Sequence, residues 1–167
     1  KNNTYDDAPL GIGHGQTISQ PTTVALMLEW LRPQIGNRVL DIGTGSGWQA
    51  ALLKHCVGKG GSVATIERIP ELAKQAKKAL TNNGFNDIKV IIGDGTKEIG
   101  PEEEFDVIVS AASSKRIPKI WIEHLSVGGR LLHPISGMGL RFITKNENGE
   151  VLKEDYPGYV FVPLITN

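Results

Sequence analysis

The sequence predicts an α/β fold, a doubly wound and mostly parallel sheet that ends in an antiparallel hairpin. Short apolar runs typical of buried strands alternate five times with apolar residues at helical spacing. After residue 138 this alternation stops, and two strand-like runs flank Asn148-Gly149, a dipeptide typical of hairpin turns. The alternation indicates a parallel sheet covered by helices, and the hairpin adds an antiparallel edge to it.

The apolar pattern places the elements in order. Residues 1–18 are glycine-rich and show no period, so we expect a loop there. The expected helices cover residues 24–31, 48–57, 70–82 and 118–125. The expected strands cover residues 38–42, 62–66, 88–92, 105–109, 130–133, 140–144, a run from 151 and 160–162. Gly128-Gly129 is expected to form a turn between the last helix and the strand that follows it.

Composition and charge argue against several classes of protein. The chain has 167 residues, with 18 Lys and Arg against 18 Asp and Glu, so its formal net charge is zero. This balance argues against a nucleic-acid-binding protein, although it leaves room for a local basic patch. The lone Cys56 allows no internal disulfide, and no apolar run reaches the ~20 residues of a membrane span. We therefore expect a cytoplasmic protein with neither nucleic-acid nor membrane partners.

The residues that end or follow the first three strands carry the chemistry. The first strand runs into Asp41-Ile42-Gly43-Thr44-Gly45-Ser46-Gly47, the second ends at Glu67, and Asp94 follows the third. Ligands of doubly wound sheets bind beyond the carboxyl ends of the strands, near the point where the strand order reverses. We therefore expect these glycines and acidic side chains to gather around one ligand.

The spacing of these residues indicates a nucleoside that carries positive charge. A dinucleotide fingerprint needs glycine at position 48, and Trp48 stands there, which disfavours a nicotinamide-dependent dehydrogenase. Glu67 can accept hydrogen bonds from both hydroxyls of a ribose, and Asp94 can accept one from an exocyclic amine. Asp41 suits a sulfonium or ammonium group. S-adenosylmethionine meets these requirements.

The same stretch, residues 39–47, resembles the first motif of the class I methyltransferases. More narrowly, the chain resembles the protein-L-isoaspartate O-methyltransferases, most specifically in His14-Gly15-Gln16-Thr17-Ile18-Ser19. The other matching stretches are 9–13, 20–21, 67–73, 93–96, 128–131 and 162–164. The resemblance implies a Rossmann-like, seven-stranded sheet in a single domain. Within residues 1–167 we expect a substrate and cofactor loop (1–20), a cofactor-binding core (37–134) and a C-terminal hairpin (138–165).

The resemblance also implies an activity and a set of site residues. It implies transfer of a methyl group from S-adenosylmethionine to the α-carboxyl of isoaspartyl residues in damaged proteins, with S-adenosylhomocysteine as product. Ser19 is implied as catalytic, and the substrate loop comprises His14, Gln16, Thr17 and Ile18. The cofactor-binding residues are expected to be Asp41, Gly43, Thr44, Gly45, Gly47, Glu67, Arg68, Asp94 and Gly95. Isoaspartyl peptides and proteins are the expected partners of a monomeric enzyme, and no metal is expected.

Three alternatives stay open from the sequence. Ser19 precedes Pro21 and is equally suited to cap the helix that begins there. Lys115, Arg116 and Lys119 could attract an acidic peptide or simply form a solvated loop and helix start. The chain could also be another S-adenosylmethionine methyltransferase with a small-molecule substrate, or a cofactor-binding core without full activity.

Overall fold

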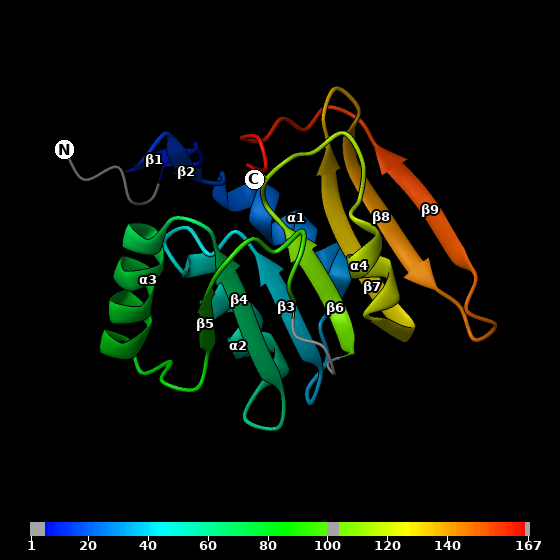
Figure 1. Ribbon diagram of the computed structural model, residues 1–167, viewed down its shortest axis with the longest axis horizontal. Coiled ribbons are helices and arrows are strands. Elements are labelled where there is room, and N and C mark those ends of the chain that lie inside the picture. Colours follow the sequence, from blue (N-terminus) through cyan, green and yellow to red (C-terminus); the bar gives the residue numbers. More distant parts are fainter. Residues whose placement is uncertain (1–5, 100–103, 166–167) are drawn as a thin grey trace.

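The computed structural model describes residues 6–99 and 104–165, which form one seven-stranded sheet and a separate two-stranded hairpin (Figure 1). The strands of the large sheet lie in the order β5-β4-β3-β6-β7-β8-β9. Their bounds are β3 Arg38–Ile42, β4 Ser62–Glu67, β5 Lys89–Ile92, β6 Phe105–Ser110, β7 Leu125–Ile135, β8 Gly139–Lys145 and β9 Val151–Tyr156. The helices are α1 Pro21–Leu31, α2 Trp48–Val57, α3 Pro70–Asn82 and α4 Lys119–Glu123.

The predicted sheet type is confirmed. Strands β5, β4, β3, β6 and β7 pair in parallel, and β8 and β9 continue the sheet in antiparallel pairing. The chain winds outward from β3 through β4 to β5 and then returns to β6 on the other side of β3. The strand order therefore reverses between β3 and β6, which places the expected ligand site at the carboxyl ends of these strands.

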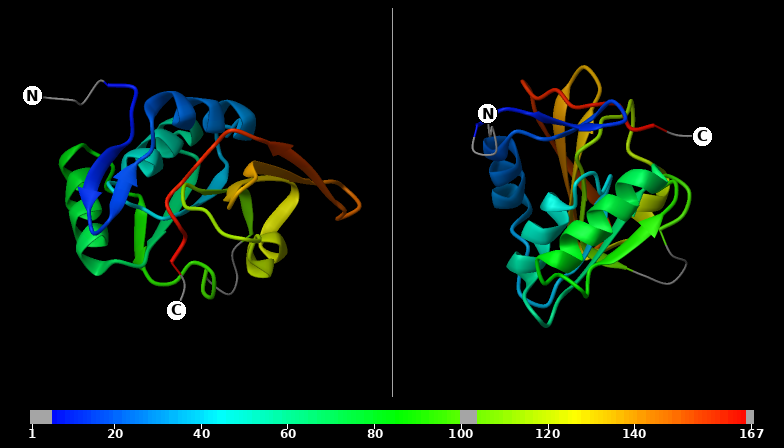
Figure 2. Two further views of the ribbon diagram at one scale, coloured as in Figure 1. Left: turned by 90° about the horizontal axis from the view of Figure 1, so that it is seen from above. Right: turned by 90° about the vertical axis from the view of Figure 1, so that its left-hand side faces the viewer.

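Each face of the sheet has its own apolar core. The alternation of side chains along β3 sends Val39 to one face and Leu40 to the other. The Val39 face packs against Met27 of α1, Leu53 of α2 and Leu80 of α3. The opposite face packs against Trp121 of α4 and is covered by fewer helices (Figure 2). The α/β layering thus follows from strands that are apolar on both sides.

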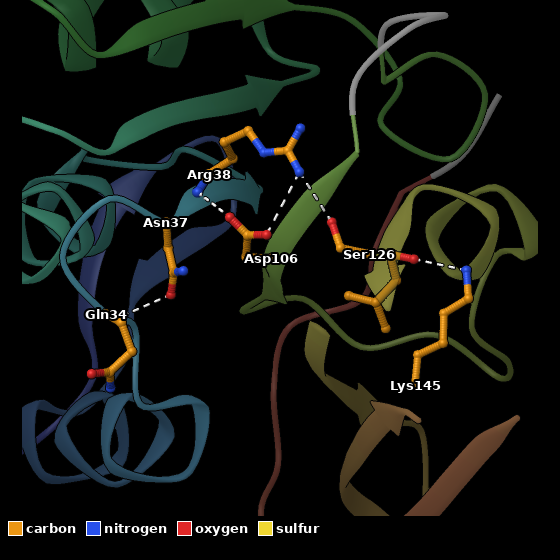
Figure 3. Close-up of polar contacts among 7 residues, drawn as sticks. Gln34, Asn37, Arg38, Asp106, Ser126 and Lys145 are labelled. Carbon is orange, nitrogen blue, oxygen red and sulfur yellow. Dashed lines mark hydrogen bonds and ion pairs between the residues drawn. The ribbon is translucent and has the colours of Figure 1, made fainter. Parts of the chain in front are cut away.

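Polar contacts join the amino ends of the central strands, opposite the expected site (Figure 3). The backbone N–H of Arg38 donates to Asp106 Oδ2 at 2.7 Å, and the Arg38 guanidinium lies 3.6 Å from Asp106 Oδ1. The same guanidinium donates to Ser126 Oγ at 3.3 Å, and Lys145 Nζ donates to the Leu125 carbonyl at 2.8 Å. These bonds hold β3, β6, β7 and β8 together at the end of the sheet opposite the expected site.

Three expectations for local structure are wrong. Residues 10–18 are not a plain loop, because β1 (Leu10–Gly13) and β2 (Gln16–Ile18) pair as an antiparallel hairpin. Residues 1–5 of the expected 1–20 loop lie outside the described residues. Gly128-Gly129 is not a turn but an irregularity within β7, which starts at Leu125 and shifts register against β6. Gly128 has a φ of +78°, which lets the chain bulge there and return to the ladder at Arg130.

The expected strand at 160–162 is also absent. The last strand is β9, and the chain then passes Pro157-Gly158 and crosses back over the carboxyl edge of the sheet. The Ser113 N–H donates to the Val162 carbonyl at 2.7 Å, and the Leu164 N–H donates to the Ser113 carbonyl at 2.7 Å. Pro163 fits between these two bonds because the N–H that proline lacks would face away from Ser113, and the segment forms an isolated bridge instead of a strand.

Candidate functional site

A cleft lies at the carboxyl edge of the sheet and is built from six segments of the chain. Its walls enclose about 690 Å³ of free space, which includes space open to solvent. The segments are the β1–β2 hairpin, the loops after β3, β4, β5 and β6, and the C-terminal segment after β9. The lining residues are Ile12, Gln16, Thr17, Ile42, Gly43, Gly45, Ile66, Glu67, Arg68, Ile69, Gly93, Asp94, Gly95, Ala111, Ala112 and 162–165.

Glu67 fixes the glycine loop at the centre of the cleft. Its Oε2 accepts from the Gly45 N–H at 2.9 Å, and its Oε1 accepts from the Ile69 N–H at 2.9 Å. Gly45 has a φ of +52°, and a Cβ there would lie 3.3 Å from the Ile12 side chain of the hairpin. One carboxylate therefore joins the end of β4 to the glycine loop and to the residues that enter α3.

Gly47 holds the loop by packing instead of lining the cleft. It caps the N-terminus of α2 with a φ of +84°. A Cβ at this position would lie 3.1 Å from Leu80 Cγ of α3. A glycine is required because α2 and α3 approach each other closely here and the backbone is left-handed.

Asp41 lies beneath the glycine loop and is not part of the cleft lining. Its side chain is completely buried, where Oδ1 accepts from Gln49 Nε2 and Oδ2 accepts from Thr65 Oγ1, both at 2.8 Å. The hydroxyls of Thr65 and Thr44 share a hydrogen bond at 2.7 Å in which either can be the donor. This chain of hydrogen bonds links the glycine loop to β3, β4 and α2.

Burial raises the pKa of Asp41 from its usual 3.8 to about 7, because water no longer solvates its charged form. The hydrogen bonds from Thr65 and Gln49 oppose this shift, and the negative charge of Glu67 adds to it.

Asp94 and Gly95 form the wall of the cleft after β5. Asp94 Oδ1 accepts from the Thr96 N–H at 3.0 Å and from Thr96 Oγ1 at 2.7 Å, which closes the turn on itself. The Gly95 carbonyl accepts from Trp121 Nε1 at 2.7 Å, and a Cβ on Gly95 would lie 3.0 Å from Ile42 Cγ2. The turn is therefore anchored to α4 on one side and packed against the floor of the cleft on the other.

The β1–β2 hairpin brings only part of the predicted substrate loop to the cleft. Gln16 and Thr17 line it, whereas His14 is exposed at the tip of the hairpin with a φ of +53°. Ile18 points into a separate apolar groove between α2 and α3, beside Trp48. The hairpin is thus an edge of the cleft whose inner residues are Ile12, Gln16 and Thr17.

Ser19 is half-buried between β2 and α1 and does not line the cleft. The alternative that Ser19 caps α1 is wrong, because Gln20 is the N-cap residue and no side chain of the cap bonds the helix. Asp7 supplies the acceptors instead: Oδ1 accepts from the Thr22 N–H at 2.9 Å, and Oδ2 accepts from Thr22 Oγ1 at 2.7 Å. These bonds lower the pKa of Asp7. The catalytic role of Ser19 stays a prediction.

Several lining residues were not predicted. Ala111 and Ala112 follow β6, so the rule that ligands bind beyond strand ends could have found them. Ile42, Ile66 and Ile69 form an apolar floor of the cleft beside the predicted glycine and acidic residues, and an apolar residue at a strand end carries no signal of its own. Residues 162–165 close the cleft from the far end of the chain, and their pairing with Ser113 has no local sequence signal.

Within residues 6–99 and 104–165, no three His, Cys, Asp or Glu side chains are grouped as metal ligands. None of the helices described here is long and apolar enough to cross a membrane.

The buried carboxyl of Asp41 predicts a specific dependence of stability on pH. In the unfolded chain this group loses its proton near pH 3.8, whereas in the folded protein it keeps it up to about pH 7. Its contribution to the free energy of unfolding should therefore fall by about 1.4 kcal/mol per pH unit between these values as pH rises. Asp41→Asn should remove this slope, as measured by urea unfolding at pH 5 to 8. Thr65→Ser, which keeps the hydroxyl donor, is the matched control; parallel curves for wild type and Asp41→Asn would contradict the assignment.

Comparison with known proteins identifies the family. The family model described as Protein-L-isoaspartate(D-aspartate) O-methyltransferase (PCMT) matches residues 1–167. A protein-L-isoaspartate O-methyltransferase 2 of Archaeoglobus fulgidus is 44% identical over 166 residues, which is 98% of this chain and 76% of that protein. A protein-L-isoaspartate O-methyltransferase of Ignicoccus hospitalis is 44% identical over 165 residues, 96% of this chain and 78% of that protein.

A solved structure agrees with these relatives. It is described as a protein-L-isoaspartate O-methyltransferase of Plasmodium falciparum in complex with S-adenosyl-L-homocysteine. It superposes on this protein with a TM-score of 0.90 at 28% sequence identity, and the match covers 100% of this chain and 84% of the Plasmodium chain. The chain therefore belongs to the protein-L-isoaspartate O-methyltransferase family.

Proposed function

We propose that this protein transfers a methyl group from S-adenosylmethionine to the α-carboxyl of L-isoaspartyl residues in damaged proteins, with S-adenosylhomocysteine as product. Family membership supports the reaction, and the observation that carries the cofactor assignment is the carboxylate of Glu67 in the cleft. Its two oxygens each accept one backbone N–H. Because a carboxylate oxygen accepts up to two hydrogen bonds, both oxygens can still receive one ribose hydroxyl each.

The rest of the cleft fits the remaining parts of the cofactor. Asp94 stands at the next strand end, where it would accept from the adenine amine, above the apolar floor of Ile42 and Ile66. Of the nine predicted cofactor residues, Gly43, Gly45, Glu67, Arg68, Asp94 and Gly95 line the cleft. The other three do not line the cleft: Asp41 and Thr44 hold the glycine loop through hydrogen bonds, and Gly47 holds it by packing against α3.

The proposed reaction depends on the relative position of the two reactants and needs no proton transfer by the protein. The bound cofactor supplies a methyl group on a positively charged sulfonium. The α-carboxylate of an isoaspartyl residue has a pKa near ~3.5, so it is already ionised at neutral pH and needs no general base. The protein must align this oxygen with the methyl group, and alignment of two reactants is worth roughly 7–11 kcal/mol.

Two segments would provide this alignment. The hairpin with Gln16 and Thr17, and the C-terminal segment with Val162 and Leu164, both border the cleft. With a peptide between them, they would exclude water from the reacting carboxylate. Ser19, at the base of the hairpin, would donate its hydroxyl to the carboxylate when the hairpin closes.

The expected setting of the enzyme follows from the sequence. We expect a monomer in the cytoplasm that acts on isoaspartyl peptides and proteins, with neither nucleic acid nor membrane as partner. The lone Cys56, half-buried in α2, and the zero net charge support this expectation. The protein would act as one domain in which the core 37–134 binds the cofactor.

A methylation assay tests the proposed function. The protein is incubated with methyl-labelled S-adenosylmethionine and a pair of peptides that differ only in isoaspartate against aspartate. We expect base-labile label on the isoaspartyl peptide alone, because a carboxyl methyl ester hydrolyses in base. Base-stable label, or equal label on both peptides, would contradict the proposal in favour of another methyltransferase, and cofactor binding without any transfer would indicate a core without activity.

Ser19→Ala tests the substrate-side role of this hydroxyl. Loss of one hydrogen bond to a charged carboxylate should lower kcat for the isoaspartyl peptide by about 10- to 100-fold. The Kd for S-adenosylhomocysteine, measured by calorimetry, should change by less than about twofold, because the hydroxyl does not line the cleft. Ser62→Ala, an exposed serine at the amino end of β4, is the control. Equal losses in turnover and in affinity would argue against the assignment.

Glu67→Gln tests the carboxylate that joins the loop to the cofactor. An amide nitrogen cannot accept a hydrogen bond, so either Gly45 or Ile69 loses its acceptor and one ribose hydroxyl loses its partner. We expect affinity for S-adenosylhomocysteine to fall at least about tenfold and the free energy of unfolding to fall by about 1–3 kcal/mol. Glu71→Gln, on the exposed first turn of α3, should change neither. Unchanged affinity in Glu67→Gln would refute its role.

A further inference from the structure

A second hollow, the basic groove, opens beside the cleft. It is lined by Thr96 and Lys97 after β5, by residues 114–120, which run from the loop after β6 into the first turn of α4, and by Leu164. Four of its lining residues are cationic, namely Lys97, Lys115, Arg116 and Lys119, and none is acidic. The hollow contains about 1350 Å³ of free space including its open mouth, so it can take several side chains at once.

The positive charge of the basic groove is only partly neutralised. Lys97 Nζ lies 3.9 Å from Asp94 Oδ2, and Lys119 Nζ lies 2.7 Å from Glu123 Oε1. Lys115 and Arg116 are exposed, and neither forms an ion pair with any residue in the described ranges. A chain whose formal net charge is zero therefore carries a local excess of positive charge at this place.

The backbone that carries these two cations is held in a fixed position. The Ser114 N–H donates to the Pro134 carbonyl at 3.1 Å, and the Ser136 N–H donates to the Ser114 carbonyl at 2.9 Å. The Ser114 hydroxyl donates to the Arg116 carbonyl at 2.6 Å. The loop is thus attached to the end of β7, while the side chains of Lys115 and Arg116 extend into solvent.

The basic groove is continuous with the cleft. Leu164 lines both, and the lining passes from Gly95 in the cleft to Thr96 in the groove. It passes likewise from Ala112 in the cleft to Ser114 in the groove. Because the two hollows share a wall, a peptide with its isoaspartyl residue in the cleft can place side chains of neighbouring residues over the groove.

We propose that the basic groove binds aspartate and glutamate side chains that flank the isoaspartyl residue, so that the enzyme selects damaged sites in acidic segments. This inference rests on the proposed function. Arg116 offers a planar fork of donors that matches a carboxylate, and Lys115 adds a second charge beside it. The fixed loop lets these side chains meet the peptide without first reordering the backbone.

The test compares isoaspartyl peptides that share one core and carry acidic, neutral or basic residues on both sides. For wild type we expect kcat/KM to be about 3- to 10-fold higher for the acidic peptide than for the neutral one, the scale of two exposed ion pairs. The ratio should approach one as salt is raised to about 1 M. Lys115→Glu/Arg116→Glu should invert the ratio in favour of the basic peptide. Lys77→Glu/Lys78→Glu, an adjacent pair of exposed lysines on α3, should keep the wild-type ratio.

The outcomes separate this inference from the function on which it rests. If wild type does not methylate the neutral isoaspartyl peptide, the proposed function fails. If it methylates all three peptides equally well, the function stands and the role of the basic groove is overturned. An equal loss of preference in the Lys77/Lys78 control would also overturn it, since the effect would then come from net charge. Tighter binding of a single-stranded oligonucleotide to wild type than to the Lys115/Arg116 variant, with no peptide preference, would assign the groove to nucleic acid instead.

Discussion

The carboxylate of Glu67 is the contact on which the site depends. It ends β4, and its two oxygens accept the N–H of Gly45 and the N–H of Ile69, so three segments meet at one side chain. Gly45 makes its bond to Glu67 with a left-handed backbone, a conformation that a β-carbon would oppose. The position of the glycine loop, and hence the shape of the cleft, follows from this arrangement.

Asp41 and Glu67 perform different tasks although both stand at the carboxyl end of a strand. Asp41 faces α2, is fully buried and holds the glycine loop through Thr65 and Thr44. Glu67 faces the cleft and is available to a ligand. Burial raises the pKa of Asp41, whereas the two oxygens of Glu67 accept backbone N–H groups at the wall of the cleft. The hydrogen bonds of Asp41 therefore hold the glycine loop from below, and those of Glu67 hold it from the side of the cleft.

Much of this arrangement could be predicted from the sequence. The spacing of apolar residues predicts the parallel sheet. The rule that ligands bind beyond the carboxyl ends of the strands predicts that Gly43, Glu67 and Asp94 line one site. The same rule predicts the position of Asp41 at the end of β3, but its burial and its bonds to Gln49 and Thr65 have no signal in the pattern. Asp7 accepts the Thr22 N–H in the first turn of α1 although it lies 15 residues earlier in the sequence, so no local pattern predicts this bond. Similarly, the segment after β9 is positioned by Ser113, so its crossing over the cleft is a tertiary effect without a local signal.

The most direct test of this account is a crystal structure of the protein with S-adenosylhomocysteine. We expect the nucleoside in the cleft at the carboxyl edge, with both ribose hydroxyls on the Glu67 carboxylate and the adenine amine on Asp94. We also expect that Asp41 keeps its bonds to Gln49 and Thr65 and makes no contact with the ligand. The ligand in the apolar groove between α2 and α3, or a ribose bound without Glu67, would contradict the account.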